Sequence, residues 1–210
     1  LPPALMGAYL ARGIGSRPPA AAFLVLLMPL MAVSEPRFES PLHRVTTTMR
    51  IDAPPEAVWE NVVGFSRLPE PARWFFELGV AYPVQARLEG TGVGAVRYCE
   101  FSTGPFVEPV THWEPPRRLG FSVTAQPPTM EEWSPYEMVN APHLTESLRS
   151  RRGEFLLQPL ADGGTLLQGS TWYTLAMEPQ FYWSAWSDWL IHAIHRRVLL
   201  HIKTETEEGA

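Results

Sequence analysis

The sequence predicts an α+β domain in which a curved antiparallel sheet of about six to seven strands wraps around a long C-terminal helix. Segments rich in β-branched residues recur between residues 42 and 176, and short turns containing glycine or proline separate most of them. Short turns join neighbouring antiparallel strands, whereas parallel strands need long crossovers. One long amphipathic stretch, from about residue 180 to residue 206, closes the pattern.

The first predicted strand, residues 42–52, alternates apolar and polar side chains, which is typical of a half-buried strand. Pro54, Pro55 and Glu56 follow it directly. Proline fits the first turn of a helix, and an acidic side chain is favourable at the positive end of the helix dipole. The sequence therefore predicts a short helix here, and a second helical piece, interrupted by prolines, over residues 65–77.

The middle of the chain predicts strands joined by turns, and one long connection. Residues 126–151 contain four prolines and no sustained periodicity. An ordered loop of this length is usually functional, so this segment is expected to form a lid. The strands are predicted at residues 80–88, 93–102, 106–113, 119–125, 153–160 and 165–176, and the last helix at residues 180–206.

On a helical wheel, the last helix has an apolar face, which is expected to pack on the sheet, and a polar face, which is expected to meet solvent. His192 and His195 share the polar face, and their H-x-x-H spacing can chelate a metal. No carboxylate ligand accompanies them, so a surface pair without a metal is expected. The apolar face comprises Trp183, Trp186, Leu190, Ile191, Ile194, Val198 and Ile202, and the polar face Asp188, His192, His195, Arg196 and Lys203.

Residues 1–41 differ from the rest because they include an apolar run, Ala20 to Val33, with few charges around it. This run is shorter than the roughly 20 residues that a membrane-spanning helix needs. Two interpretations stay open: a membrane span or anchor over residues 18–33, or a signal-type segment or a helix packed outside the domain. If the run spans a bilayer, Arg12 and Arg17 before it place the domain on the non-cytoplasmic side; the alternative is a cytoplasmic protein.

The composition restricts the classes of function. With 17 basic and 22 acidic residues, the net charge is −5, which argues against a nucleic-acid partner. The single cysteine, Cys99, excludes an internal disulfide and a cysteine-rich metal cage. No dinucleotide fingerprint, phosphate-binding glycine loop or nucleophile elbow occurs, so no cofactor is expected. Eight tryptophans exceed what a core needs, and surplus tryptophan often lines a ligand cavity.

The segment IDAPPEAVWENV (51–62), the turn-rich middle and the aromatic and histidine pattern of the last helix resemble the SRPBCC superfamily. This superfamily includes START domains, pollen-allergen-like proteins and polyketide cyclase/dehydrase-like proteins. The resemblance covers residues 42–206, and residues 207–210 are a tail. It implies a helix-grip fold with a largely apolar cavity between the sheet and the last helix. It does not imply one activity, because members include cyclases, lipid and hormone carriers and co-chaperone domains.

Polar side chains inside such a cavity would distinguish an enzyme from a carrier. Arg97 and Tyr98 point to opposite faces of their strand, and the sequence leaves open which face is inside. An inward Arg97 would bind a carboxylate or pair with Glu108 across the following turn, whereas a solvated Arg97 is the more frequent case. The apolar neighbours of Glu108 are compatible with a desolvated carboxyl of raised pKa.

The predicted lid and the end of the chain supply further candidates. His143, in the lid, could act as a general acid or base near neutral pH. Tyr173 and Glu108 are the other catalytic candidates. The candidates for ligand binding are Arg97, Tyr98, Trp133, Tyr136, Trp172, Tyr173, Trp183 and Trp186.

Three hypotheses for the function follow. The first is binding or transport of a hydrophobic small molecule, such as a lipid, a polyketide or an isoprenoid. The second is an enzyme of the cyclase/dehydrase type, in which an acid or base in the cavity promotes enolisation while the walls fold the substrate. The third is a protein-interaction domain with a filled core. The presence of a cavity, and the polar side chains inside it, would distinguish these hypotheses.

Overall fold

The computed structural model describes residues 40–71, 73–131 and 147–209. The apolar run of residues 18–33 and most of the predicted lid, residues 132–146, therefore lie outside the described residues. Within the three described ranges, no helix is both long and apolar enough to cross a membrane.

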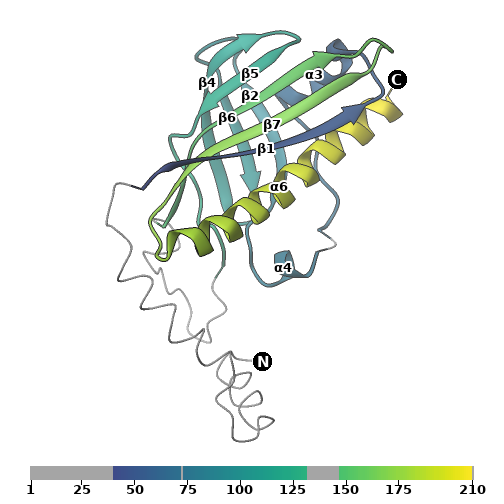
Figure 1. The fold of residues 1–210 in the computed structure, drawn as a ribbon. Helices are drawn as coiled ribbons and strands as arrows, with labels where there is room; N and C mark the ends of the chain where they lie inside the picture. The colour runs from purple at the N-terminus through teal and green to yellow at the C-terminus, as the bar shows by residue number, and fades with distance from the viewer. Residues whose placement is uncertain (1–39, 72, 132–146, 210) are drawn as a thin grey trace, which may run out of the picture.

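The described residues form seven strands and three helices, which are labelled in Figure 1. The elements in chain order are β1 (Leu42–Ile51), α3 (Pro55–Val63), α4 (Trp74–Glu77), β2 (Pro83–Glu89), β3 (Val96–Phe101), β4 (Gly104–Glu114), β5 (Arg118–Ser122), β6 (Leu148–Pro159), β7 (Thr165–Leu175) and α6 (Gln180–Glu208).

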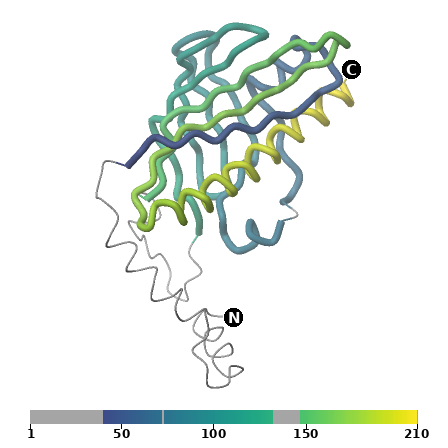
Figure 2. Tube along the Cα trace, viewed as in Figure 1, coloured from purple at the N-terminus to yellow at the C-terminus, as the bar shows by residue number. Residues whose placement is uncertain are grey.

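The strands form one sheet with the order β1-β7-β6-β5-β4-β3-β2, and all neighbouring strands are antiparallel. The sheet curls, and α6 runs along its concave side (Figures 1 and 2). The first and last strands in sequence, β1 and β7, pair with each other, and the C-terminal end of α6 lies beside the end of β1, where the Asp52 N–H donates to the Glu207 carboxylate at 2.7 Å. This arrangement confirms the predicted α+β class and the predicted sheet around one terminal helix.

Turn chemistry explains the hairpin between β6 and β7. Gly163 has a φ of +86°, a left-handed conformation that glycine adopts without the steric cost of a Cβ. The side chain of Asp162 accepts a hydrogen bond from the backbone N–H of Gly164 at 3.2 Å, which is typical of tight turns. This turn brings β6 back onto β7 with the register that places Gly153 opposite Thr171.

The prediction of a helical piece over residues 65–77 is wrong for most of its length, because only α4 is helical there. Pro69 and Pro71 lack a donor N–H and clash with a preceding helical turn. The segment before them runs beside β2 instead. The N–H of Leu68 donates to the Val84 carbonyl at 2.8 Å, and the Phe65 carbonyl accepts from Ala86 at 3.1 Å.

Strand β6 begins earlier than predicted, so residues 148–151 belong to the sheet and not to the connection before it. Gln126 supports this earlier start. Its side-chain amide donates to the Leu148 carbonyl at 2.7 Å and accepts from the Ser150 N–H at 2.9 Å. The amide therefore satisfies the backbone groups of β6 in the manner of a neighbouring strand.

The face of α6 that meets the sheet agrees with the prediction at Ile191, Val198 and Ile202, which are buried, and differs from it at two tryptophans and at His195. Trp183 and Trp186, expected on the packed face, are 37% and 47% exposed. His195, expected in solvent, lies half-buried between α6 and the sheet. A helical wheel assigns polar residues to solvent, but Ser187 is buried and His195 is half-buried here. Ser187 can be buried because it is small, and His195 can leave solvent because the hydroxyls of Thr171 and Thr47 satisfy its ring nitrogens. The buried residues of α6 are Ser187, Ile191, Ala193, Val198, Leu199, Ile202 and Thr206.

The larger cluster of buried apolar side chains lies where α3 and the C-terminal half of α6 meet the sheet. Val58 and Val62 of α3 and Leu199 and Ile202 of α6 are fully buried in it. The side chain of Asn61 donates to the hydroxyl of Thr206 at 3.0 Å, which holds the two helices together. Among the described residues, no helix as long as α3 packs on the N-terminal half of α6, and Ser187, Leu190 and Ile191 of this half border the pocket described next.

Candidate functional site

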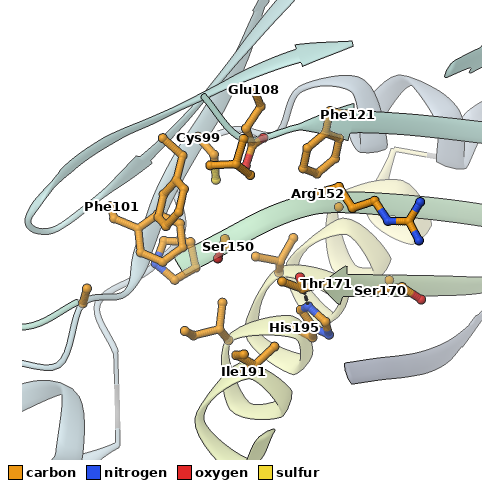
Figure 3. A pocket seen from close by; sticks show the side chains of 18 of the residues that line it. Cys99, Phe101, Glu108, Phe121, Ser150, Arg152, Ser170, Thr171, Ile191 and His195 are labelled. Carbon is orange, nitrogen blue, oxygen red and sulfur yellow. Dashed lines mark hydrogen bonds between the residues drawn. The ribbon is translucent and has the colours of Figure 1, made fainter. Parts of the chain in front are cut away.

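A pocket of about 180 Å³ lies between the concave face of the sheet and α6 (Figure 3). The sheet contributes Ser150 and Thr171 to its lining, and the helix contributes Ile191 and His195. The interior is therefore not packed solid. Its volume is below the roughly 300 Å³ of a small ligand pocket, so a ligand of ordinary size fits only if the walls move apart. Five phenylalanines dominate the lining, namely Phe65, Phe101, Phe106, Phe121 and Phe155.

A buried ion pair forms part of the pocket wall on β3 and β4. Arg97 and Glu108 face each other in the strand register, and the Arg97 guanidinium donates to the Glu108 carboxylate. Arg97 is only 2% exposed, and its guanidinium lies 5.2–5.8 Å from the ring centres of Phe65, Phe121 and Phe155. Arg97 therefore points inward, and the more frequent case of a solvent-exposed arginine does not apply here. The inward position is tolerated because Glu108 neutralises the charge and the aromatic faces contribute cation–π attraction.

The electrostatics of this pair follow from burial and from mutual attraction. Burial raises the pKa of the Glu108 carboxyl, and Arg97 opposes that shift. Burial disfavours the charged form of Arg97, but attraction to Glu108 raises the pKa of Arg97 overall, so the guanidinium stays charged. Burial also raises the pKa of Cys99 to about 12, which leaves this thiol protonated and a poor nucleophile.

The Nε atom of Arg97 has no hydrogen-bond partner within the described ranges. A buried donor without an acceptor costs roughly 1–3 kcal/mol, so most such donors in proteins are satisfied. Arg97 lines the pocket, and an oxygen atom of a bound molecule is the kind of acceptor that this donor lacks.

A second polar group of the pocket is a chain of hydrogen bonds around His195. Its Nε2 lies 2.8 Å from the Thr171 hydroxyl and its Nδ1 lies 3.1 Å from the Thr47 hydroxyl. The Thr47 hydroxyl is also 2.8 Å from Nδ1 of the exposed His192. Because a hydroxyl has one proton, Thr47 donates to one imidazole and accepts from the other. The chain connects the pocket to solvent through groups that can both donate and accept.

Burial, with a smaller contribution from His192, lowers the pKa of His195 to about 4. The imidazole is therefore neutral at neutral pH. The half-buried position of His195 could not be predicted from the sequence, because it depends on Thr47 and Thr171, which lie in strands distant from α6 in the chain. The expectation of a surface histidine pair is correct only for His192. Among the described residues, no group of histidine, cysteine or acidic side chains is arranged to hold a metal ion.

We expect His195 to make the fold sensitive to mild acid. Below a pH of about 6.5 the unfolded chain binds a proton at this position, whereas the folded chain does so only near pH 4. The free energy of unfolding should therefore fall as the pH drops through this window. Between pH 7 and pH 4, the free energy of unfolding should fall by about 2 kcal/mol less in His195→Gln than in the wild type, because glutamine binds no proton. This figure allows for partial solvent screening. Urea unfolding at several pH values measures the difference, and equal losses in both proteins would contradict the assignment.

Three of the sequence-derived candidates, Trp133, Tyr136 and His143, lie outside the described residues. Of the others, only Arg97 and Glu108 line the pocket. Trp183 and Trp186 are on the solvent side of α6.

The remaining three candidates lie on the sheet, away from the pocket lining. Tyr98 is on the outer face, where the Arg87 guanidinium lies 4.4 Å from its ring centre. Trp172 is also on the outer face, and the Arg152 guanidinium lies 4.1 Å from its ring centre. Tyr173 points inward but donates to Asp188 at 2.7 Å, and burial with this bond raises the pKa of Tyr173.

Residues 43–204 match the model of a family described as polyketide cyclase/dehydrase and lipid transport. The chain belongs to this family. Among solved structures, this family member is similar to a START superfamily protein from Mycobacterium smegmatis. The identity is 11% and the TM-score 0.52, over 80% of this chain and 99% of that chain.

Norcoclaurine synthase from Thalictrum flavum, in a complex with dopamine and hydroxybenzaldehyde, is also similar to this family member. The identity is 12% and the TM-score 0.51, over 86% of this chain and 92% of that chain. At these identities the likeness concerns the fold alone. The family match and the shared fold confirm the resemblance to the SRPBCC superfamily. No curated protein matches the chain.

Proposed function

We propose that the chain binds a hydrophobic small molecule, of the lipid, polyketide or isoprenoid kind, between the sheet and α6. The observation that carries this proposal is the pocket, whose lining is dominated by phenylalanine and aliphatic side chains. Burying apolar surface of a ligand there contributes roughly 25 cal/mol per Å². The membership of the chain in a family described by cyclisation, dehydration and lipid transport supports the same class of ligand.

The buried ion pair favours a ligand that carries at least one oxygen atom. Because Glu108 already neutralises Arg97, a charged ligand is not needed to balance the site. The free Nε donor of Arg97 would be satisfied by a carbonyl, hydroxyl or ether oxygen. The ligand would then bury its apolar part against the phenylalanines and direct its oxygen toward Arg97. Among the sequence-derived candidates for binding, Arg97 is the one that this arrangement uses.

The apolar run of residues 18–33 would place the domain close to its ligands if it associates with a membrane. Hydrophobic ligands concentrate in bilayers, and a protein held at the bilayer surface collects them without diffusing through water. Membrane association through this run remains part of the proposal, because the run lies outside the described residues.

Filling the pocket tests the proposal. Ser150 lies on the inner face of β6 and lines the pocket, so Ser150→Phe should occupy the space that a ligand would take (Figure 3). N-phenyl-1-naphthylamine, a neutral apolar dye that becomes fluorescent in apolar surroundings, serves as the probe. We expect its affinity for the variant to be at least about tenfold weaker than for the wild type. Native mass spectrometry of the wild type should also detect a co-purified apolar molecule.

Thr48→Phe is the matched control, because Thr48 is exposed on the outer face of β1. This variant should bind the dye as the wild type does. Circular dichroism should show that both variants keep the fold. Equal dye binding by Ser150→Phe and by the wild type would overturn the proposal.

A second candidate function, acid–base chemistry of the cyclase/dehydrase type, is favoured by one observation. His195 borders the pocket as a neutral imidazole and is connected through Thr47 to the exposed His192. A neutral imidazole can accept a proton from an enolisable substrate, and the hydroxyl chain can exchange that proton with solvent; the pKa of about 4 makes His195 a weak base, so slow exchange is expected. Exchange of the α protons of 2-tetralone with deuterated water, lost in His195→Gln, would support an enzyme. Dye binding without such exchange would support a carrier.

A further inference from the structure

The N-terminal half of α6 and the short helix α4 carry a surface of exposed aromatic side chains, here called the aromatic patch. Soluble monomers rarely expose a continuous apolar surface, and one that they do expose usually binds something. The patch consists of Trp74 (66% exposed), Phe181 (54%), Trp183 (37%), Trp186 (47%) and Trp189 (42%).

The four tryptophan rings of the patch are linked to one another through the rings of Phe75 and Tyr182, and Phe181 lies beside Tyr182 in the chain, so these residues are not scattered. The continuity runs from α4 to the start of α6. The distances between ring centres are 5.9 Å for Trp74 and Phe75, 4.9 Å for Phe75 and Trp189, 5.7 Å for Trp189 and Trp186, and 6.4 Å for Trp186 and Tyr182.

We propose that the aromatic patch docks onto the surface of a lipid bilayer. The first argument is its chemistry. Indole combines a large apolar ring with one N–H donor, and tryptophan accordingly concentrates at the boundary between lipid headgroups and acyl chains. Four of the five patch residues are tryptophans.

The second argument is the distribution of charge. Between residues 180 and 191 the helix contains a single charged residue, Asp188, and this side chain accepts a hydrogen bond from Tyr173. Exposed Arg73 precedes α4, and exposed Arg196 lies about two turns beyond Trp189 on α6. Two exposed carboxylates, Glu77 at the end of α4 and Glu178 just before α6, also border the patch. The apolar centre is therefore nearly free of charge, and the charged groups of both signs lie at its edge, where they can stay in the hydrated headgroup layer of a bilayer.

The third argument is the position of the patch relative to the apolar run Ala20 to Val33. Leu42, at the start of β1, pairs with Thr174 near the end of β7, and α6 begins shortly after β7. Figure 1 shows the start of β1 at the same end of the molecule as the start of α6. Residues 34–41 can span at most about 28 Å when extended. The apolar run and the aromatic patch can therefore reach the same bilayer.

A bilayer explains both apolar features with one occupant, whereas a protein partner or a second copy of the chain would explain only the patch. The inference does not depend on ligand binding in the pocket. Ser150→Phe tests the pocket alone, so the two proposals can fail separately.

Quenching of tryptophan emission by brominated lipid tests the docking. The full chain is mixed with vesicles of phosphatidylcholine and phosphatidylglycerol that contain phosphatidylcholine brominated on its acyl chains. No tryptophan precedes Trp59 in the sequence, so the emission reports on residues 59–189 and not on the apolar run. We expect strong quenching in the wild type. In the double variant Trp74→Gln/Trp186→Gln, quenching should be at least about twofold weaker, because the two most exposed tryptophans of the patch are absent.

Val93→Gln is the matched control, because Val93 is 68% exposed in the turn at the other end of β2 from α4. Its quenching should equal that of the wild type. The proposal is overturned if the wild type is not quenched, or if the double variant is quenched as strongly as the wild type. Self-association that the double variant abolishes, without quenching by vesicles, would also overturn it and would assign the patch to contact between two copies.

Discussion

Replacing Glu108 with glutamine is expected to lower the free energy of unfolding by about 3–5 kcal/mol. The substitution keeps the shape of the side chain but leaves the charge of Arg97 without a counter-ion. Arg97 is 2% exposed and surrounded by three phenylalanine rings, so water cannot replace the missing carboxylate. Urea unfolding of the full chain measures the loss.

Two controls separate the missing charge from other causes. Glu89→Gln removes a carboxylate from the exposed pair with Arg87, and we expect no measurable change, because solvent screens such pairs. The double variant Arg97→Met/Glu108→Leu removes both charges, and it should recover most of the stability that Glu108→Gln loses. A Glu108→Gln variant as stable as the wild type would show that the pair is hydrated in solution.

Replacing Leu199 with alanine is expected to cost about 2–5 kcal/mol of unfolding free energy and to enlarge the pocket. Leu199 is fully buried on the side of α6 that faces the sheet, and it lines the pocket. Removing its outer carbon atoms deletes packing contacts and leaves a void that the surrounding strands fill only in part. Chemical unfolding gives the stability, and a crystal structure of the variant gives the pocket volume.

Leu200→Ala is a matched control one residue further along the helix. Leu200 is 55% exposed, so its truncation should change the unfolding free energy by less than about 0.5 kcal/mol. Dye binding separates two effects of the Leu199 variant. If the present volume limits ligand size, Leu199→Ala should bind N-phenyl-1-naphthylamine more tightly than the wild type despite its lower stability. If Leu199→Ala and Leu200→Ala lost equal unfolding free energy, the orientation of α6 described here would be contradicted.

Much of the fold could be predicted because its signals are local. Alternation of side chains and turn residues identified each strand of the sheet, and Pro54 with Pro55 marked the start of α3. The helical piece predicted over residues 65–77 is helical only at α4, because Pro69 and Pro71 prevent a helix in the residues before it. The start of β6 at Leu148 could not be predicted from local signals, because the side-chain amide of the distant Gln126 supports this part of the strand.

The candidate site was harder to predict, because its residues come together only through pairing between strands. Arg97 and Glu108 were candidates from sequence, but their burial depends on the register of β3 with β4 and on rings from other elements. His195 was assigned to solvent. Its real position depends on Thr47 of β1 and Thr171 of β7, which lie 148 and 24 residues away in sequence.

By itself, the sequence determined the α+β class, the order of strands and helices, and the amphipathic last helix. These properties follow from dihedral preferences, turn chemistry and the period of hydrophobic residues, all of which act between near neighbours. Only the tertiary structure decided which polar groups enter the pocket and which tryptophans of α6 remain in solvent. These outcomes depend on whether a buried polar atom finds a partner elsewhere in the chain, since the cost of burying an unpaired charge or donor exceeds the small preferences that a helical wheel records.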